Sequence, residues 1–320
     1  MSECKNNNSL NCFQKNIIIY PHAGFNLSNG GIVVQYYLAN ILDSMEINVK
    51  ICNVYDKNAE NILFNKFITI DEINSSIDFE NTIIIYCEGV IGNPLKGKYV
   101  VRWLLSKLDM NVPFHYINTW DNNELVYFFN SEIDIIKNKS NIKYLSLFYV
   151  NPIFENKNLK NRNGLCFTRR KQSKNCKEIH KKNTSFEITV HHTQNDYLDI
   201  FNKHEMFLSY DPLTFLSIIA IKCGCISVIH PLEGISKKDY FKTTALYNYM
   251  NEKNIDSIYG IAYGVSDDEI NYAKTTLHLF EEQLIDINNW FIKKYIHNFI
   301  NNINNWNNCS NTLFNYKIYS

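Results

Sequence analysis

Short runs of β-branched residues, each followed by a glycine-rich loop and then a helical pattern, are the feature that most constrains this chain. Residues 16–20 (NIIIY) are apolar on both faces, as strands buried inside a parallel sheet are. A loop with three glycines follows, and from 32 to 42 the apolar residues recur at helical spacing. Strands that alternate with helices predict right-handed βαβ units, and therefore an α/β fold with a doubly wound sheet.

The same two patterns recur along the rest of the chain. They predict buried strands at 47–54, 82–87, 114–118, 144–150, 164–168, 186–190, 206–210 and 226–230. They predict helices at 98–108, 212–222, 267–283 and 285–303. The polar segment 151–163 separates the strands into two sets, and we interpret it as a linker between two domains.

A chain of 320 residues is long enough for two domains that each bury a core. We expect a disordered tail at 1–15, a Rossmann-like domain at 16–150, a second Rossmann-like domain at 164–284, and a C-terminal helix and tail at 285–320. The two domains are expected to face each other across a cleft. Open α/β sheets bind ligands beyond the carboxyl ends of their strands, so the candidate residues are sought in the loops there.

Composition excludes several classes of function. Lys+Arg and Asp+Glu both number 32, so no net charge draws the chain to nucleic acid or to an anionic membrane. The nine cysteines form no CxxC pair, which predicts reduced thiols and no zinc site. No apolar run approaches the roughly 18 residues that span a bilayer, and the polar N-terminus has no signal-peptide pattern. We therefore expect a cytoplasmic protein without integral membrane association.

The segment 207–231 contains the best candidate site. Asp211 ends a predicted strand, Pro212 suits the first position of a helix, and Thr214 lies in that helix's first turn. Free backbone N–H groups and the helix dipole at such a position favour a phosphate or a carboxylate. The alternative is that Asp211 only caps the helix.

This segment resembles the donor-binding motif of GT-B glycosyltransferases. In many retaining members an acid is followed after seven residues by a Glu, and then by a turn with Cys and Gly. Asp211 matches the first acid, whereas Ile219 stands where the second would be. Residues 209–234, 92–105 and 259–264 more closely resemble an uncharacterised group of GT-B-like proteins from bacteria and large DNA viruses. The matches extend from about residue 20 to 283.

The resemblance implies that the first domain binds the acceptor and the second the nucleotide sugar. Arg169, Arg170 and Lys171 leave the first strand of the second domain, where GT-B enzymes often hold the donor diphosphate. A leaving diphosphate gains charge, and cations stabilise it. The alternative for the three residues is a solvated basic turn.

In the first domain, the loop 21–31 resembles the first glycine-rich loop of GT-B enzymes. Gly30 and Gly31 would let the backbone approach a ligand closely. The loop is neither a GxGxxG dinucleotide motif nor a P-loop. His22 in the same loop is a candidate base or acceptor contact, and an ordinary βα loop is the alternative.

Three further residues follow predicted strands. Glu88 ends the strand at 82–87 and is a candidate for acceptor activation, with a capping or salt-bridged loop acid as the alternative. Glu233 and Ser236 follow the strand at 226–230, in a loop that contacts sugar or phosphate in GT-B folds. Ser236 also has the pattern of a helix N-cap.

The sequence therefore predicts a glycosyltransferase that moves a sugar from a nucleotide sugar to a glycan or other acceptor. The nucleotide sugar is a co-substrate, and no other cofactor is expected. No DxD-type motif follows a strand, so metal-independent activity is predicted. Two alternatives stay open: a nucleotide-sugar epimerase or other sugar-phosphate enzyme on the same scaffold, and a non-catalytic relative that only binds.

Overall fold

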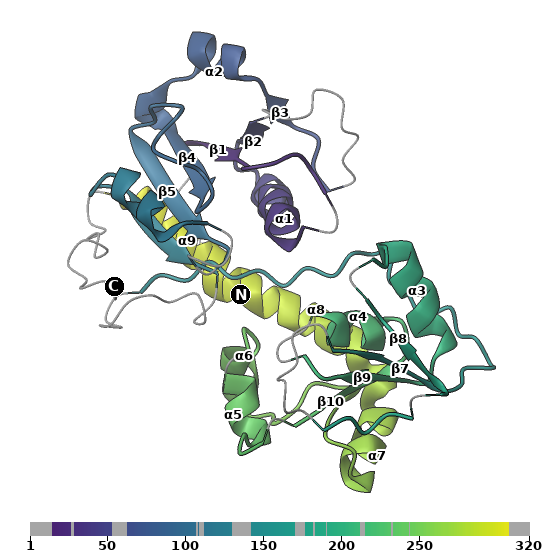
Figure 1. Ribbon diagram of the computed structural model, residues 1–320. Coiled ribbons are helices and arrows are strands. Elements are labelled where there is room, and N and C mark those ends of the chain that lie inside the picture. Colours follow the sequence, from purple (N-terminus) through teal and green to yellow (C-terminus); the bar gives the residue numbers. More distant parts are fainter. Residues whose placement is uncertain are drawn as a thin grey trace, which may run out of the picture. The chain divides into compact units, whose positions relative to one another are not determined.

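The computed structural model describes residues 15–26, 29–52, 63–106, 108, 112–129, 142–169, 177–181, 183–189, 191–211, 215–231, 233–242 and 244–306 (Figure 1). The chain divides into two compact units. Unit 1 comprises Met1–Leu147 and Lys293–Ser320, and unit 2 comprises Phe148–Ile292. The chain therefore enters unit 2 once and returns to unit 1 near its end.

Unit 1 contains a six-stranded sheet in the order β3-β2-β1-β4-β5-β6, and every pairing is parallel. Its strands are β1 (Asn16–Tyr20), β2 (Val49–Cys52), β3 (Phe67–Ile68), β4 (Thr82–Cys87), β5 (Tyr99–Leu104) and β6 (Leu125–Phe128). All six residues of β4 are buried. Burial on both faces explains why these central strands are continuous apolar runs instead of alternating ones.

Helices cover both faces of this sheet. They are α1 (Gly30–Ser44), α2 (Ile70–Ser76), α9 (His297–Asn304) and the 3₁₀ helices η1 (Phe79–Asn81) and η2 (Phe114–Thr119). Ile73 of α2 packs in one cluster with Ile18 and Ile84. On the opposite face, the ring of Phe299 in α9 lies 5.2 Å from the ring of Tyr127 in β6. The end of the chain thus completes the core of unit 1.

Unit 2 contains a five-stranded parallel sheet in the order β11-β10-β9-β7-β8. Its strands are β7 (Leu165–Thr168), β8 (Ser185–Glu187), β9 (Met206–Ser209), β10 (Ile226–Ile229) and β11 (Ile261–Tyr263). Its helices are α3 (Gln194–Lys203), α4 (Leu216–Lys222), α5 (Lys237–Lys242), α6 (Tyr247–Lys253), α7 (Asp267–Thr276), η4 (Leu277–Leu279) and α8 (Phe280–Phe291). A π-helical turn, Ile292–Ile296, joins α8 to α9.

The two faces of the unit 2 sheet carry separate cores. On one face, Cys166 and Phe207 pack against Phe201 of α3 and Ile219 of α4. On the other, neighbouring strand residues including Leu208 pack against Ala273 of α7. Alternate residues of each strand supply the two cores, as the two-residue period of a strand requires. The α/β class with parallel sheets is therefore confirmed.

Most predicted strands are present, but three predictions were wrong. Residues 98–108 were expected to form a helix and instead contain β5. Residues 114–118 belong to the 3₁₀ helix η2, and 144–150 contain only an isolated bridge between Tyr144 and Phe128. The sequence also missed β3, β6, β11, α2, α3, α5 and α6. Residues 1–14 of the predicted tail lie outside the described part of the chain.

Within the part of the chain that the structure describes, no helix combines the length and apolar character needed to cross a membrane. The longest described helix, α1, has 15 residues.

Candidate functional site

Each sheet contains one position where the strand order reverses direction, and open α/β sheets bind ligands beyond the carboxyl ends of the strands at such positions. In unit 1 the chain leaves β1 toward β2 and β3 on one side, and β4 lies on the other side. In unit 2, β8 lies on one side of β7 and β9 on the other. We call the carboxyl ends of β1 and β4 the unit 1 switch point, and those of β7 and β9 the unit 2 switch point.

At the unit 1 switch point, His22 follows β1 and Cys87 is the last residue of β4. The imidazole Nδ1 of His22 lies 3.1 Å from the sulfur of Cys87. His22 is half-buried, and Cys87 is buried. Burial, together with the charge of Glu88, raises the pKa of the Cys87 thiol to about 12. The thiol is therefore neutral at pH 7, and the pair is no thiolate–imidazolium dyad.

Glu88 is buried directly after β4 and joins the ends of two strands. One carboxylate oxygen accepts a hydrogen bond from the backbone N–H of Leu105 at 2.8 Å, and the other accepts one from Ser106 Oγ at 2.5 Å. Both donors follow β5, the neighbour of β4. Since both oxygens have donors, these contacts favour an anchoring role. That Glu88 activates an acceptor stays a prediction.

Gly30 and Gly31 form the first turn of α1, whose N-cap is Asn29. The side chain of Asn29 accepts a hydrogen bond from the backbone N–H of Ile32 at 3.2 Å. A Cβ on Gly31 would lie 3.4 Å from Asn29 Oδ1 and 3.7 Å from Leu105, whereas a Cβ on Gly30 would meet nothing within 4 Å. The start of α1 therefore adjoins the end of β5, with open space at Gly30.

Arg102 stabilises the loop after β4 through hydrogen bonds to its backbone. This residue was expected on a helix but lies in β5, where its side chain is fully buried. Its guanidinium donates to both carboxylate oxygens of Glu124, at 2.6 and 3.0 Å. It also donates to the backbone carbonyls of Val90, at 2.9 Å, and Gly92, at 2.5 Å. Arg102 is therefore a structural cation, and its ion pair satisfies it inside the core.

At the unit 2 switch point, Asp211 lies two residues beyond β9 and is 1% exposed. Its Oδ2 is 3.5 Å from the hydroxyl of Thr168 at the end of β7, and Ser209 Oγ donates to its backbone carbonyl at 3.0 Å. The predicted contacts Pro212 and Thr214 lie outside the described residues. Ile219, at the position of the missing second acid, lies in α4 and packs into the core between this helix, α3 and the sheet.

Arg169 follows β7 and is exposed, but two carboxylates already engage it. Its Nε and Nη2 donate to the two oxygens of Glu187 at 2.8 and 3.1 Å, and Nη1 donates to Glu178 at 2.5 Å. The hydrogen bond with Glu187, then that with Glu178, raises the pKa of Arg169. One cation with two anions leaves a local charge of −1. Arg170 and Lys171 lie outside the described residues.

Tyr210, which the sequence did not identify, organises this edge. Its hydroxyl oxygen lies 2.8 Å from the backbone N of Ile179, and 3.1 and 2.9 Å from the backbone N and Nδ1 of His180. The oxygen can accept from both backbone N–H groups, and it also lies within hydrogen-bond distance of Nδ1. The His180 ring also stacks on Phe167 with 3.8 Å between centroids. Residues 179–180 are thereby fixed over the ends of β7 and β9.

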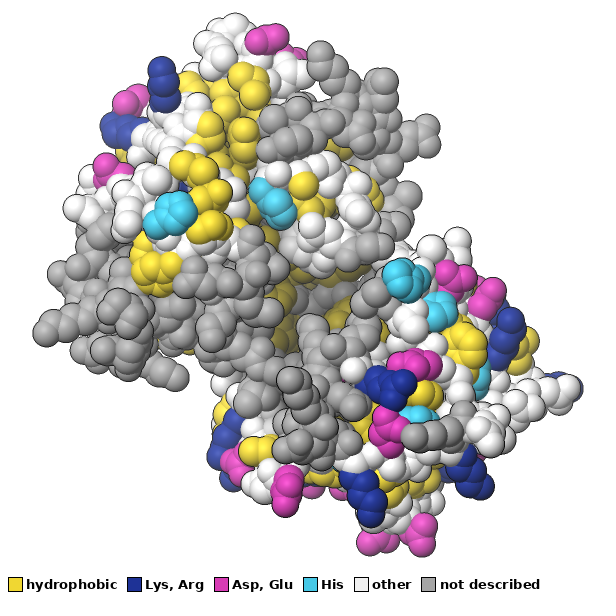
Figure 2. Space-filling model, viewed as in Figure 1, with side chains coloured by type: hydrophobic (Ala, Val, Ile, Leu, Met, Phe, Trp, Pro, Cys, Tyr) yellow, Lys and Arg dark blue, Asp and Glu magenta, His cyan; other side chains and the backbone are white. Residues whose placement is uncertain are grey.

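The last two predicted contacts lie in the loop after β10. Ser236 accepts a hydrogen bond from the backbone N–H of Asp239 at 3.2 Å and donates to its carboxylate at 2.6 Å. It therefore caps α5, which is the alternative that the sequence left open. Glu233 is exposed in the turn that precedes it. Among the described residues on the face shown in Figure 2, basic and acidic side chains are interspersed, without a continuous basic patch.

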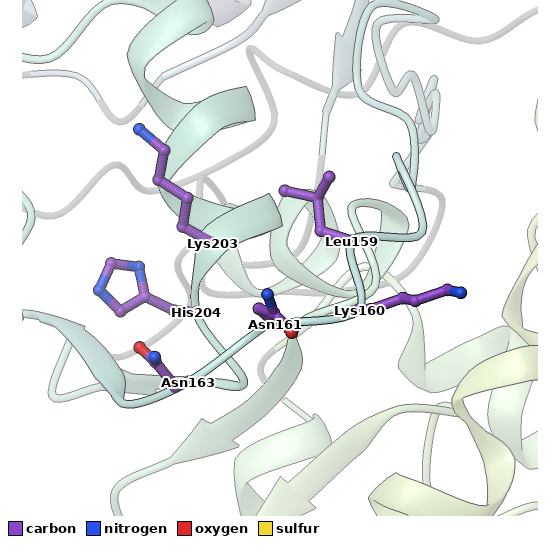
Figure 3. A pocket seen from close by; sticks show the side chains of 6 residues that line it. All are labelled: Leu159, Lys160, Asn161, Asn163, Lys203 and His204. Carbon is purple, nitrogen blue, oxygen red and sulfur yellow. The ribbon is translucent and has the colours of Figure 1, made fainter.

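A hollow of about 580 Å³ lies at the opposite edge of the unit 2 sheet. It is lined by Leu159, Lys160, Asn161, Asn163, Lys203 and His204 (Figure 3). Figure 3 shows the side chains of Lys160 and Lys203 pointing in different directions. Lys203 ends α3, where a cation offsets the negative end of the helix dipole. The hollow precedes β7 and has no part in either switch point.

Among the described residues, no group of three or more His, Cys, Asp or Glu side chains is placed to hold a metal ion. Two of the predicted site residues in unit 1, His22 and Glu88, follow the two strands that form one switch point, and α1 begins near the end of the neighbouring strand β5. In unit 2, Asp211 and Arg169 flank the other. The sequence missed the partners of these residues because they lie far away along the chain: Cys87 for His22, and Glu178 and Glu187 for Arg169.

No known family model matches the sequence, and no curated protein matches it. Among solved structures, a glycosyltransferase from Rickettsia africae ESF-5 is similar with a TM-score of 0.47 and 10% identity, over 90% of this chain and 99% of that one. T4 phage β-glucosyltransferase has a TM-score of 0.45 and 13% identity, over 88% and 99%. OtsA has a TM-score of 0.48 and 8% identity, over 92% and 100%. Solved structures similar to the chain thus include glycosyltransferases, at a distance that shows no family membership.

Proposed function

We propose that this chain is a GT-B-type glycosyltransferase that transfers a sugar from a nucleotide-sugar donor to a glycan or other acceptor. The observation that carries the proposal is the position of its polar residues. Two separate parallel sheets each place side chains that can bind a ligand or transfer a proton at the point where the strand order reverses. Two such sheets suit a reaction with two substrates, and the resemblance of residues 209–234 to a donor-binding motif points to a nucleotide sugar.

Unit 2 is proposed to bind the donor. The buried Asp211 contacts the nucleoside or the sugar, and the backbone at Thr214 receives a phosphate. Because Glu178 and Glu187 neutralise Arg169, the further cations that a leaving diphosphate needs are proposed to be Arg170 and Lys171. This arrangement uses protein cations and amides in place of a metal, so activity is proposed to be metal-independent.

Unit 1 is proposed to bind the acceptor. His22 lies at the switch point, half-buried, and accepts the proton of the attacking hydroxyl. Glu88 holds the ends of β4 and β5 together, and the backbone N–H groups at Gly30 and Gly31 bind an oxygen of the substrate. The proton thus moves from the acceptor hydroxyl to the imidazole as the sugar leaves the diphosphate.

The experiment is a thermal-shift screen with UDP, GDP, CMP, ADP, dTDP and their sugars, each with and without EDTA. Selective stabilisation by one nucleotide, insensitive to EDTA, supports the proposal; one site at a hundredfold excess over Kd contributes about 2.7 kcal/mol. Asp211→Asn should remove that shift. Asp239→Asn, an exposed acid of α5, is the matched control and should retain it. Stabilisation by none of the nucleotides would contradict the proposal.

A second candidate, a non-catalytic binding protein, is favoured by two observations. The carboxylates of Glu178 and Glu187 occupy the guanidinium of Arg169, and Ile219 replaces the second acid. This candidate predicts carbohydrate binding without any nucleotide effect. An epimerase would instead convert a nucleotide sugar without added acceptor, which product analysis by chromatography would reveal.

A further inference from the structure

His22 and Cys87 form a side-chain contact where β1 and β4 end, at the unit 1 switch point. Adjacent strands β1 and β4 run parallel with Tyr20 beside Tyr86, so the residues after them lie at the same edge. There the Nδ1 of His22 lies 3.1 Å from the sulfur of Cys87. The contact is therefore built by the central pairing of the sheet, and two residues that are 65 positions apart meet in it.

The backbone of Gly89 lies against the same imidazole. A Cβ at position 89 would lie 3.4 Å from both Cβ and Cγ of His22, which is at the short end of van der Waals contact. The imidazole of His22 thus contacts the Cys87 sulfur through Nδ1, and the backbone of Gly89 packs against its Cβ and Cγ. Such a ring has one nitrogen, Nε2, that the described contacts leave for a ligand.

We propose that Cys87 is a positioning residue: its sulfur accepts a hydrogen bond from Nδ1–H of His22 and so directs the Nε2 lone pair toward the ligand. A neutral imidazole carries its proton on one nitrogen and a lone pair on the other, so the partner at Nδ1 decides what Nε2 can do. With the proton on Nδ1, Nε2 can take a proton from a hydroxyl. With the proton on Nε2, it could only donate. That the hydroxyl belongs to a sugar acceptor rests on the proposed function.

Donors that surround the sulfur favour this direction. The backbone N–H groups of Gly89, His22 and Cys87 itself all favour negative charge on the Cys87 sulfur, so the sulfur already sits among donors. Nδ1–H is a further donor, and a stronger one than S–H, which favours the hydrogen bond from the imidazole to the sulfur. Burial keeps the thiol protonated, with its pKa at about 12, so the sulfur carries no charge at pH 7. Cys87 therefore orients His22 without forming an ion pair.

The test is the tautomer of His22, measured by long-range ¹H–¹⁵N NMR of the full-length protein with His22→Gln for assignment. In the wild type, the proton is expected on Nδ1. Cys87→Ala should move it toward Nε2, the tautomer that free histidine favours, and Cys87→Ser should keep it on Nδ1 because a hydroxyl also accepts. A wild-type proton on Nε2, or an unchanged tautomer in Cys87→Ala, would overturn the proposal.

Kinetics give an independent readout. With the donor identified by the nucleotide screen and an acceptor found by product analysis, Cys87→Ala should lower kcat roughly 10- to 100-fold, as expected for a misplaced catalytic group, with KM for the donor unchanged. Cys87→Ser should restore most of kcat, and Gly89→Ala, which crowds the ring, should lower it. If Cys87→Ala does not fold, the tautomer of His22 in the wild type and in Cys87→Ser still tests the proposal. A tautomer on Nδ1 with no nucleotide effect would retain this inference and reject the proposed function.

Discussion

Arg169 and Glu187 form a two-point ion pair, with Nε and Nη2 of the arginine 2.8 and 3.1 Å from the two carboxylate oxygens. Glu178 takes the remaining Nη1. A phosphate that binds Arg169 must displace these carboxylates. We therefore expect Glu187→Gln to raise affinity for the donor nucleotide by about two- to fivefold, since an exposed ion pair contributes about 0.2–1 kcal/mol. Isothermal titration calorimetry at low ionic strength measures it.

The matched variants are Glu178→Gln, with the same expected gain, and Arg169→Ala, with a loss. Glu281→Gln serves as the control, because this exposed acid pairs with Lys222 away from the switch points. Unchanged affinity in Arg169→Ala together with Glu187→Gln would show that Arg169 serves only the structure. The ion pair between Arg169 and Glu187 would then only link the ends of β7 and β8.

Glu88 is expected to act on stability more than on chemistry. Glu88→Ala leaves the buried N–H of Leu105 and the hydroxyl of Ser106 without their acceptor, so the free energy of unfolding should fall by about 1–3 kcal/mol. Glu88→Gln keeps an oxygen for Leu105, and its NH₂ can donate to Ser106, so the loss should be smaller. Urea unfolding with Glu80→Gln, an exposed acid, as control measures both. A loss of kcat by 100-fold or more in Glu88→Gln at unchanged stability would instead support Glu88 as the base.

Ile219 shows what restoring the missing acid would do. Its side chain is 8% exposed and packs against α3, so Ile219→Glu would place an unpaired carboxylate in the core. We expect the free energy of unfolding to fall by about 3 kcal/mol or more, without a gain in nucleotide affinity. Ile219→Val, which removes one methylene, should reduce it by about 0.5–1.5 kcal/mol. A stable Ile219→Glu variant with tighter nucleotide binding would contradict the packing seen in unit 2.

Two capping boxes predict a loss of stability in acid. Hydrogen bonds from the backbone of Thr69 lower the pKa of Glu72 below its ordinary 4.5, and those from Thr193 lower that of Asp196 below 3.8. A pKa that is lower in the folded state adds stability above the unfolded value, and this stability is lost as pH falls through the folded value. The loss should therefore begin near pH 4.5 and continue below 3.8.

The measurement is the Tm by circular dichroism from pH 7 to pH 3. A double variant, Glu72→Gln with Asp196→Asn, removes both titrating carboxylates, so it should be less stable at pH 7 and should show a flatter decline toward acid. The same slope in both proteins would mean that other carboxylates govern the acid transition. Asp286, whose pKa is lowered chiefly by its hydrogen bond with Lys253, would be the next to test.

The strands show where sequence patterns suffice. Residues 82–87 were predicted because a continuous run of β-branched and other apolar residues is typical of a strand buried on both faces, and all six residues of β4 are buried. Residues 98–108 were misread as a helix because Lys98, Arg102 and Ser106 interrupt the apolar run every four residues, which is the spacing of one helix face. Arg102 is nonetheless buried in β5, since Glu124 neutralises it. Glu124, the ion-pair partner that allows Arg102 to be buried, lies 22 residues further along the chain.

The candidate site divides in the same way. Because all strands of a parallel sheet end at one edge, the sequence by itself determined that His22, Glu88, Arg169 and Asp211 follow strand ends and that an α/β fold brings them there. Only the tertiary structure decided which of them are engaged. The partners, Cys87, Leu105, Ser106, Glu178 and Glu187, reach them across strand pairings that local periodicity does not encode. Strand order is set by long-range packing, and it is strand order that locates the two switch points.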